Sequence, residues 1–389
     1  MGCLLLVQAL ACAQPVSLDA CKPWPRWDMF KANFVSPDGR VIDVGSADTR
    51  TVSEGQAYGL FFALVAGDRP EFDKILEWTE ANLAEGDLIA HLPAWLWGQK
   101  KDGSWGVLDS NSASDADLWI AYSLLQAGRD WHERRYIALG NLLAKRILQQ
   151  ETATLPGLGL SLLPGPVGFQ LGPQTWRLNP SYVPLQLLQG LATALPEQTQ
   201  WKQMRAPALR LMIETATRGF APDWAEYHAS DNTAEAHDTD RGTGFAGDAA
   251  TAAVGSYDAI RVYLWTGMLA SADPARARLL KAFQPMAEYI GTHGFPPEKI
   301  DTVHGNSPPQ AGPSGFSAAV LPFLDSSDRA ALANAQMARV NTLEQQAPAG
   351  YFSQVLSLFG TGWHEARYRF AADGSLRPAW GTACSPGSH

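Results

Sequence analysis

Apolar residues recur with helical spacing along most of the chain. Two clear stretches are 57–64 and 118–125, where apolar side chains stand at i, i+3, i+4 and i+7. Further helices are predicted over 75–83, 136–149, 184–194, 201–216, 259–270, 275–292, 330–345 and 351–359. Only short alternating segments such as 367–370 have the pattern of strands. The pattern predicts a mainly α-helical protein.

The predicted helices belong to one domain. No tract of Gly and Ser, or of Pro, separates two halves of the chain, so we expect a single domain over residues 21–389. Many amphipathic helices in one domain favour stacked helical hairpins or a helical toroid, although no repeat of fixed length is visible. The stretch 230–253 differs, since Phe245 is its only large apolar residue. It is predicted to be a long exposed loop or a disordered insertion.

The N-terminal stretch 1–20 has features of a signal peptide. An apolar run closes in Ala11-Cys12-Ala13, the small-x-small pattern of a cleavage site, although no basic residues precede it. A buried N-terminal helix is the alternative. Export predicts a periplasmic or secreted protein, and no later window has the roughly 18 apolar residues of a membrane span. The mature chain would keep Cys21 and Cys384, either as one disulfide or as two free thiols.

Composition narrows the classes of ligand. The 389 residues are 46% hydrophobic and 18% charged, which is typical of a folded chain, and the net charge of −9 argues against nucleic acid as a partner. Fourteen Trp, fifteen Phe and ten Tyr suit a large core or a cleft that stacks sugar rings. No zinc-ligand spacing, Walker loop or Gly-x-Ser-x-Gly motif is present, so we expect neither a metal nor another cofactor.

An acidic residue opens a predicted helix at three places. In the first, Ser53 stands three residues before Gln56, which is the spacing of a capping box, and Glu54 lies in the first turn. A carboxylate there stabilises the helix dipole by a few tenths to about 1 kcal/mol, so a purely structural role is the alternative to catalysis.

The other two places add two candidates for chemistry. Ser114 and Asp117 again have capping-box spacing, which leaves Asp115 without a role in the cap. Asp258 precedes the third helix, and Arg261 follows it at the i+3 spacing of an ion pair, which could equally lie on the surface. A helical toroid can bring three such helix ends into one cleft.

Glycoside hydrolysis requires a set of carboxyl groups of this kind. One carboxyl must be protonated to give its proton to the leaving oxygen, and another must be ionised to activate water or attack the sugar. A helix N-terminus favours the anion. If Glu54 donates the proton, we therefore expect burial or a neighbouring charge, such as that of Asp115, to raise its pKa.

Long segments around these acids resemble a known family. Residues 113–131 resemble the active-site signature of glycoside hydrolase family 8. Residues 51–59 are similar to the family segment that holds the proton donor, and 256–261 to the one that holds the catalytic base. The resemblance implies an all-α (α/α)6 barrel with minor short β segments, a long open cleft for a β-1,4-glucan, inversion of the anomeric carbon and no cofactor.

The resemblance also implies roles for individual residues. Glu54 would be the general acid, Asp258 the base that activates water, and Asp115 a catalytic residue that binds and helps distort the sugar. An inverting enzyme separates acid and base by roughly 6.5–9.5 Å, and we expect this of Glu54 and Asp258. The residues that match substrate-binding positions of the family are Trp95, Trp97, Asn111, Tyr182 and Arg261. Core packing is the alternative for the two tryptophans.

Other segments narrow the resemblance within the family. From about Cys21 to Cys384, the chain looks like the periplasmic endo-β-1,4-glucanases of bacterial cellulose-synthesis systems, on the segments 92–98, 108–112, 179–182, 315–319 and 358–363. This implies an inverting endo-β-1,4-glucanase that trims cellulose during its synthesis or secretion, with the cellulose synthase or export complex as a partner. The alternatives are a family enzyme for xylan, chitosan or mixed-linkage glucan, and a non-catalytic glucan-binding subunit. The loop before Asp258 is longer than the family pattern.

Overall fold

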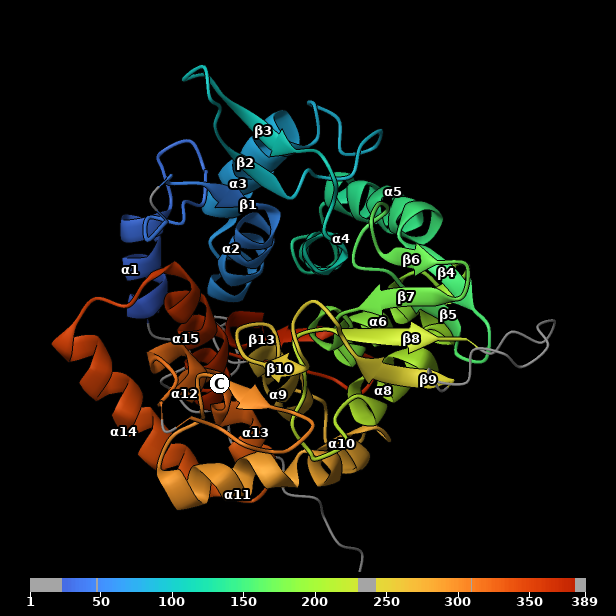
Figure 1. The fold of residues 1–389 in the computed structure, drawn as a ribbon. Coiled ribbons are helices and arrows are strands. Elements are labelled where there is room, and N and C mark those ends of the chain that lie inside the picture. The colour runs from blue at the N-terminus through green and yellow to red at the C-terminus, as the bar shows by residue number, and fades with distance from the viewer. Residues whose placement is uncertain (1–22, 47, 230–242, 309, 382–389) are drawn as a thin grey trace, which may run out of the picture.

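The computed structural model describes residues 23–46, 48–229, 243–308 and 310–381. The predicted signal peptide, Cys21 and Cys384 lie outside these residues. Inner and outer helices alternate around a ring, as an (α/α)6 barrel requires (Figure 1). The inner helices are α2 (Ser53–Ala66), α4 (Ser114–Asp130), α6 (Leu185–Ala194), α9 (Ile260–Gly267), α12 (Ser314–Ala319), α13 (Leu321–Ser326) and α15 (Tyr351–His364). The predicted fold class is therefore confirmed.

Each outer helix packs against the inner helices through one apolar face. In α5, the buried residues include Tyr136, Leu139, Leu143 and Ile147, at intervals of three or four residues. The inner helix α2, by contrast, buries nearly every side chain, as expected for a helix that is apolar all round. The outer helices are α1 (Pro25–Phe34), α3 (Arg69–Leu83), α5 (Arg134–Gln150), α7 (Gln200–Gln203), α8 (Arg205–Glu214), α10 (Arg276–Ala282), α11 (Gln284–His293) and α14 (Ala330–Gln346).

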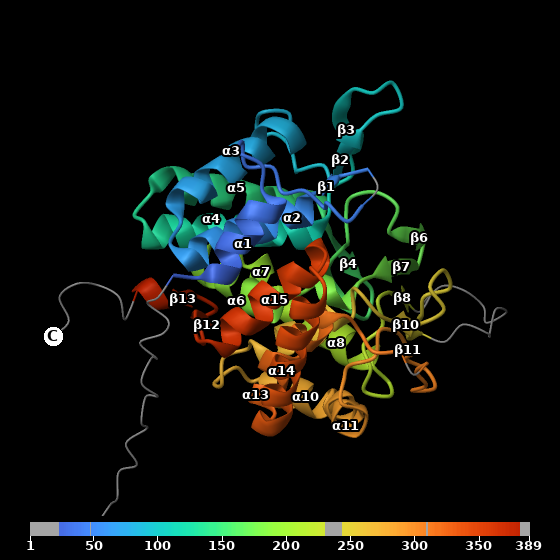
Figure 2. The same ribbon diagram turned by 90° about the vertical axis from the view of Figure 1, so that its left-hand side faces the viewer.

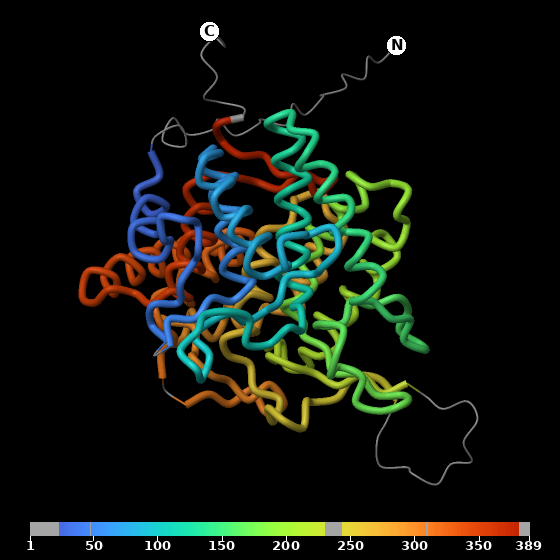
Figure 3. The backbone as a smooth tube through the Cα atoms, turned by 90° about the horizontal axis from the view of Figure 1, so that it is seen from above, coloured from blue at the N-terminus to red at the C-terminus, as the bar shows by residue number. Residues whose placement is uncertain are grey.

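The two ends of the described chain close the ring. The N-terminal helix α1, at the blue end of the described chain, packs beside the C-terminal helix α15 (Figure 3). The rings of Phe30 and Phe34 lie 6.4 and 6.2 Å from that of Tyr351. Arg26 of α1 also forms an ion pair with Glu344 of α14. Contacts of α1 with α14 and α15 therefore close the ring of helices.

An aromatic core fills the centre of the barrel. The Phe61 ring lies 4.8 Å from that of Trp119 and 5.3 Å from that of Phe359, and Trp265 lies 5.3 Å from both Trp119 and Phe359. All four side chains are buried. Inner helices α12 and α15 also come into backbone contact at Gly360, where an added Cβ would stand 1.8 Å from the Ala318 carbonyl oxygen. The centre of the barrel is therefore closely packed.

Most of the short strands gather at one end of the barrel (Figure 2). One antiparallel sheet has the order β1 (Thr51–Val52), β2 (Leu96–Gln99) and β3 (Trp105–Asp109). A second antiparallel sheet contains, in order, β6 (Gln170–Gly172), β7 (Thr175–Leu178), β8 (Ala225–His228) and β9 (Gly244–Gly247). The two-stranded pairs are β4 (Thr152–Leu155) with β5 (Gly159–Leu162), β10 (Val254–Gly255) with β11 (Ile300–Asp301), and β12 (Tyr368–Phe370) with β13 (Leu376–Pro378).

Several local predictions need correction. The expected helix over 201–216 is two helices, α7 and α8, and that over 275–292 is also two, α10 and α11. The expected exposed loop over 230–253 is wrong at 244–248, because β9 pairs with β8 and Asp248 is buried in an ion pair with Arg177, whereas 249–253 are turns. The rest of that stretch, 230–242, lies outside the described residues.

Both predicted capping boxes are also wrong. The residues at the N-caps of α2 and α4 are Val52 and Ala113, neither of which makes a side-chain cap. In α2, Gln56 turns away from the helix start: its Oε1 accepts the Val41 N–H at 2.6 Å and its Nε2 donates to Thr79 Oγ1 at 2.9 Å. Gln56 therefore joins the helix to two other segments.

Within the described residues, none of the helices combines the length and the apolar character needed to cross a bilayer. The same part of the chain contains no group of three or more His, Cys, Asp or Glu side chains arranged to hold a metal ion.

Candidate active site

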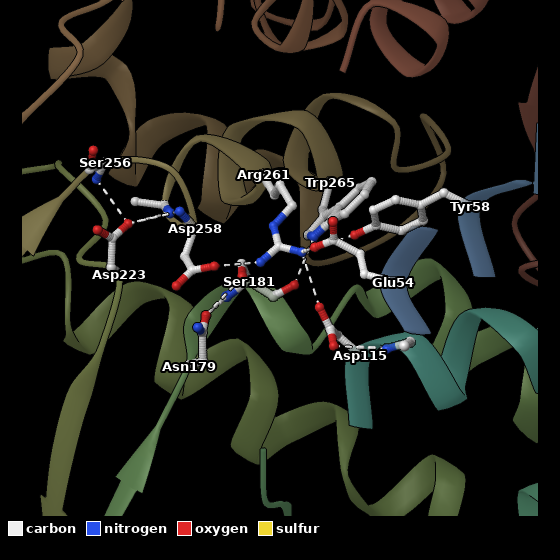
Figure 4. Close-up of polar contacts among 12 residues, drawn as sticks. Glu54, Tyr58, Asp115, Asn179, Ser181, Asp223, Ser256, Asp258, Arg261 and Trp265 are labelled. Carbon is white, nitrogen blue, oxygen red and sulfur yellow. Dashed lines mark hydrogen bonds and ion pairs between the residues drawn. The ribbon is translucent and has the colours of Figure 1, made fainter. Parts of the chain in front are cut away.

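Three carboxyl groups meet at the guanidinium of Arg261 (Figure 4). Its Nη1 donates to Glu54 Oε2 at 2.5 Å and to Asp115 Oδ2 at 3.0 Å, and its Nη2 donates to Asp258 Oδ1 at 2.6 Å. The Arg261 side chain is only 2% exposed. The structure thus brings together the three acids that the sequence singled out, and the ion pair between Asp258 and Arg261 is buried at the arginine rather than lying on the surface.

The architecture explains why these residues meet. Glu54 and Asp115 lie in the first turns of inner helices α2 and α4, and Asp258 lies just before the inner helix α9. The start of α2 is fixed by strand pairing of β1 with β2, which continues in a hydrogen bond from the Ser53 N–H to the Trp95 carbonyl. Helix N-termini that converge in this way add positive potential to a cluster of acids.

Glu54 has the environment of a group that holds a proton near neutral pH. Burial raises the pKa of Glu54 to about 7, and the charges of Asp115 and Asp258 act in the same direction. The Arg261 guanidinium opposes this rise. Burial has the larger effect, so Glu54 combines a contact to a cation with a raised pKa.

Asp115 and Asp258 differ in exposure. The Asp115 side chain is 4% exposed, and burial raises its pKa while Arg261 and the Ala116 N–H, which donates to Oδ1 at 2.8 Å, act against the rise. The Asp258 side chain is 29% exposed and therefore reaches water more easily than the other two acids. The cluster thus contains one carboxyl suited to proton donation and another accessible to water.

Two tyrosines complete the surroundings of Arg261. Its Nη1 also donates to the Tyr58 hydroxyl at 3.0 Å, and its guanidinium lies 5.7 Å from the centre of the Tyr182 ring. Sequence reasoning proposed Tyr182 but missed Tyr58. The signal was present, because Tyr58 follows Glu54 at i+4 and so lies on the same face of α2.

The other predicted substrate contacts lie beside the cluster, on or next to the β1–β2–β3 sheet. The Trp97 ring stacks on the Trp105 ring with centroids 5.2 Å apart, and the Arg40 guanidinium lies 4.4 Å from the Trp97 ring. Trp95 and Trp97 are both half-buried, and the Trp97 ring also lies 5.2 Å from the ring of the buried Trp78, so a packing role stays the alternative for Trp97. Asn111 donates from its Nδ2 to the Val167 carbonyl at 2.9 Å.

A second pair of acids, which the sequence did not reveal, lies behind Asp115. Asp117 and Glu151 are both fully buried and close enough for the charge of Glu151 to act on Asp117, although neither carboxyl oxygen of Asp117 has a hydrogen-bond partner among the described residues. Ser112 Oγ donates to Glu151 Oε1 at 2.6 Å. Burial is the main cause that raises the pKa of Glu151 to about 8 and that of Asp117 well above its usual value. Burial disfavours the charged form of both carboxyl groups, so with the pKa of Glu151 near 8 this pair holds a proton at neutral pH.

Comparisons with known proteins show which proteins this chain is similar to. The sequence profile of "Glycosyl hydrolases family 8" matches residues 4–366. An "Endoglucanase" of Salmonella typhi is 47% identical over 371 residues, which is 95% of this chain and 94% of that protein. An "Endoglucanase" of Escherichia coli K12 is also 47% identical, over 95% of both chains. The crystal structure of an endo-1,4-D-glucanase from Vibrio fischeri ES114 superimposes with a TM-score of 0.85 at 46% identity, and covers 92% of this chain and 99% of that one.

Proposed function

The chain belongs to the glycosyl hydrolases family 8, and we propose that Glu54 and Asp258 carry out an inverting hydrolysis of internal β-1,4 bonds in cellulose. The chain is a glycoside hydrolase with endo-β-1,4-glucanase activity, as the endoglucanases that are 47% identical over most of its length support. The assignment of roles rests on one observation. Glu54 and Asp258 bond to different nitrogens of Arg261 and have different environments. Glu54 is mostly buried and has a pKa near 7, whereas the Asp258 side chain is more exposed to water.

In this proposal each acid has one task. Glu54 gives its proton to the leaving oxygen of the glycosidic bond, which its raised pKa supports. Asp258 takes a proton from the water that attacks the anomeric carbon from the opposite side. Asp115 accepts a hydrogen bond from the sugar at the cleavage point and helps to distort it. No covalent intermediate forms, so Asp115 needs no nucleophilic role.

Aromatic and polar side chains beside the acids are proposed to bind the glucan. Trp95, Trp97 and Tyr182 offer ring faces to the pyranose units, and Asn111 and Arg261 offer hydrogen bonds to hydroxyl groups. Among these, Tyr182 has the clearest support, because its ring lies 5.7 Å from the Arg261 guanidinium that binds the three acids.

The biological setting is a further part of the proposal. We place the enzyme in the bacterial periplasm or outside the cell, with residues 1–20 as the signal peptide and N-terminal extension and 21–389 as the single catalytic domain. There it would act on cellulose during synthesis or secretion, in association with the synthase or export complex, and Cys21 and Cys384 would form a disulfide. These points rest on the sequence patterns described above.

The test measures chemistry and roles together. Purified protein and its Glu54→Gln variant are incubated with carboxymethylcellulose, while reducing ends, viscosity and the anomers released at early times are followed, the last by NMR. Rapid loss of viscosity, α-anomer products and a large loss of rate in the variant are expected. Binding without release of reducing ends would mean a glucan-binding subunit. Cleavage of xylan or chitosan alone would mean that the substrate is wrong.

A further inference from the structure

The turn that carries Asp258 is held by the side chain of Asp223. Asp223 Oδ1 accepts three backbone N–H bonds, from Ser256 at 2.8 Å, Asp258 at 3.0 Å and Ala259 at 2.7 Å (Figure 4). Asp223 lies two residues before β8, and its own N–H donates to the Val254 carbonyl at 2.8 Å. One carboxylate oxygen thus binds the backbone of the turn on both sides of Tyr257.

Asp223 has no counterion of its own. Across the residues that the structure describes, no Lys, Arg or His forms an ion pair with it. The three backbone N–H groups are instead the donors that stabilise its negative charge. The turn leads directly into α9, so these amides belong to the start of that helix, where a carboxylate is favoured. The segment 256–259 therefore depends on Asp223 in the way that a helix N-terminus depends on its cap.

The Asp258 carboxylate needs such an anchor. Its one hydrogen bond to a side chain among the described residues is the one from Arg261 Nη2. The neighbouring residue, Tyr257, is 43% exposed, so the turn borders solvent. The direction in which the Asp258 carboxylate points is consequently set by the backbone of the turn and by Arg261.

We propose that Asp223 is a positioning residue for Asp258, which fixes the turn 256–259 so that the Asp258 carboxylate meets Arg261 and the attacking water. This inference rests on the proposed role of Asp258 as the base. Asp223 does not touch the sugar and acts through the backbone alone. A misplacement of about 1 Å in a catalytic group can reduce the rate by about 100-fold, so the anchor matters for turnover.

Burial, together with the charge of Asp258, raises the pKa of Asp223 to about 6, although the three N–H groups act against this rise. Tyr263 is also near enough for the charge of Asp223 to raise its pKa, and its hydroxyl accepts the Ala221 N–H at 2.9 Å. A neutral side chain at 223 would remove a negative charge that faces Asp258.

The test compares Asp223→Ala with Asp223→Asn. Alanine removes the acceptor, whereas asparagine keeps an oxygen for the three N–H groups and removes the charge. With carboxymethylcellulose as substrate, Asp223→Ala is expected to lower kcat by ~10-fold or more with KM within ~3-fold of wild type. Asp223→Asn should restore kcat to within ~3-fold of wild type, because its side chain keeps an acceptor oxygen for the turn.

A cap far from the site provides the matched control. Asp68 caps α3 through the Glu71 N–H, so Asp68→Ala should lower the Tm without lowering kcat. An unchanged kcat in Asp223→Ala, or an increase in KM without a lower kcat, would overturn the inference. The activity of the wild type tests the proposed function separately. If Asp223→Ala fails to fold, Asp223→Asn decides alone: a kcat ~10-fold below wild type in that variant would overturn the inference.

Discussion

Glu54 Oε2 accepts a hydrogen bond from Arg261 Nη1, yet burial raises the pKa of Glu54 to about 7. A guanidinium in contact with a carboxylate normally holds its pKa below the usual value. In this cluster one cation is shared among three acids, so it does not neutralise each of them. The relationship makes Glu54 an acid that is protonated over part of the working pH range and still fixed in position.

The Glu54→Gln variant should lose most of its activity. Glutamine keeps the size and a hydrogen-bond acceptor for Arg261 but has no acidic proton, and general acid catalysis is worth about 100- to 10,000-fold. Release of reducing ends from carboxymethylcellulose measures the loss. Glu71→Gln, in the first turn of α3, provides a control that should retain wild-type activity. Comparable losses in the two variants would contradict the role of Glu54.

The alkaline side of the pH profile should report Glu54. Its protonated form is the active one, so kcat/KM should fall as pH rises through about 7, the value to which burial raises its pKa. The Glu54→Gln variant should lose this alkaline limb in whatever activity remains. A limb that stays at the same pH in that variant would assign it to another group.

The buried pair of Asp117 and Glu151 should make the protein less stable as pH rises. Burial raises the pKa of Glu151 from 4.5 to about 8, so the folded protein binds a proton that the unfolded chain loses above about pH 4.5. The contribution to the free energy of unfolding is therefore complete below pH 4.5, and it is lost as pH rises toward 8.

Glu151→Gln tests this directly. The amide can accept from Ser112 Oγ and donate to Asp117, without a proton that must be retained. We expect the free energy of unfolding at pH 8 to rise by roughly 1–3 kcal/mol relative to wild type, with a smaller change at pH 5. Denaturant unfolding at both pH values measures it. Glu133→Gln, at the exposed N-cap of α5, should leave the dependence on pH unaltered.

Replacement of Trp97 should separate binding from folding. If Trp97 stacks on a sugar ring, Trp97→Ala should weaken glucan binding by about 1.4 kcal/mol. This loss corresponds to a tenfold increase in KM, with little change in kcat. Trp119→Ala removes a fully buried ring from the aromatic core and should instead cost about 3–5 kcal/mol of stability. Kinetics and thermal unfolding of both variants decide between a binding role and a packing role for Trp97.

Local signals in the sequence predicted much of the helical framework and the nearby contacts of the site. The i+3 spacing of Asp258 and Arg261 predicted their ion pair, and the family resemblance pointed to Glu54 and Asp115. Contacts across long separations were not predictable. Asp223 and Ala259, or Asp117 and Glu151, are brought together only by the packing of the inner helices with the loops and outer helices around them.

The capping boxes failed for a related reason. Ser and Gln at the right spacing are equally suited to a cap and to contacts with other segments, and the sequence does not say which contact is made. In the fold, Gln56 bonds to the buried backbone N–H of Val41 and to the backbone carbonyl of Ile75. The same polar residue therefore serves tertiary structure instead of the helix end.

Asp115 and Asp117, two residues apart in the first turn of α4, constrain how that helix can move. Residues two apart on an α-helix point in directions about 200° from each other. Asp115 therefore bonds to Arg261 at the acid cluster, while Asp117 lies fully buried near Glu151. Rotation of α4 about its axis would break the bond to Arg261 and move Asp117 from its buried position at the same time, so the two acids together constrain the orientation of the helix.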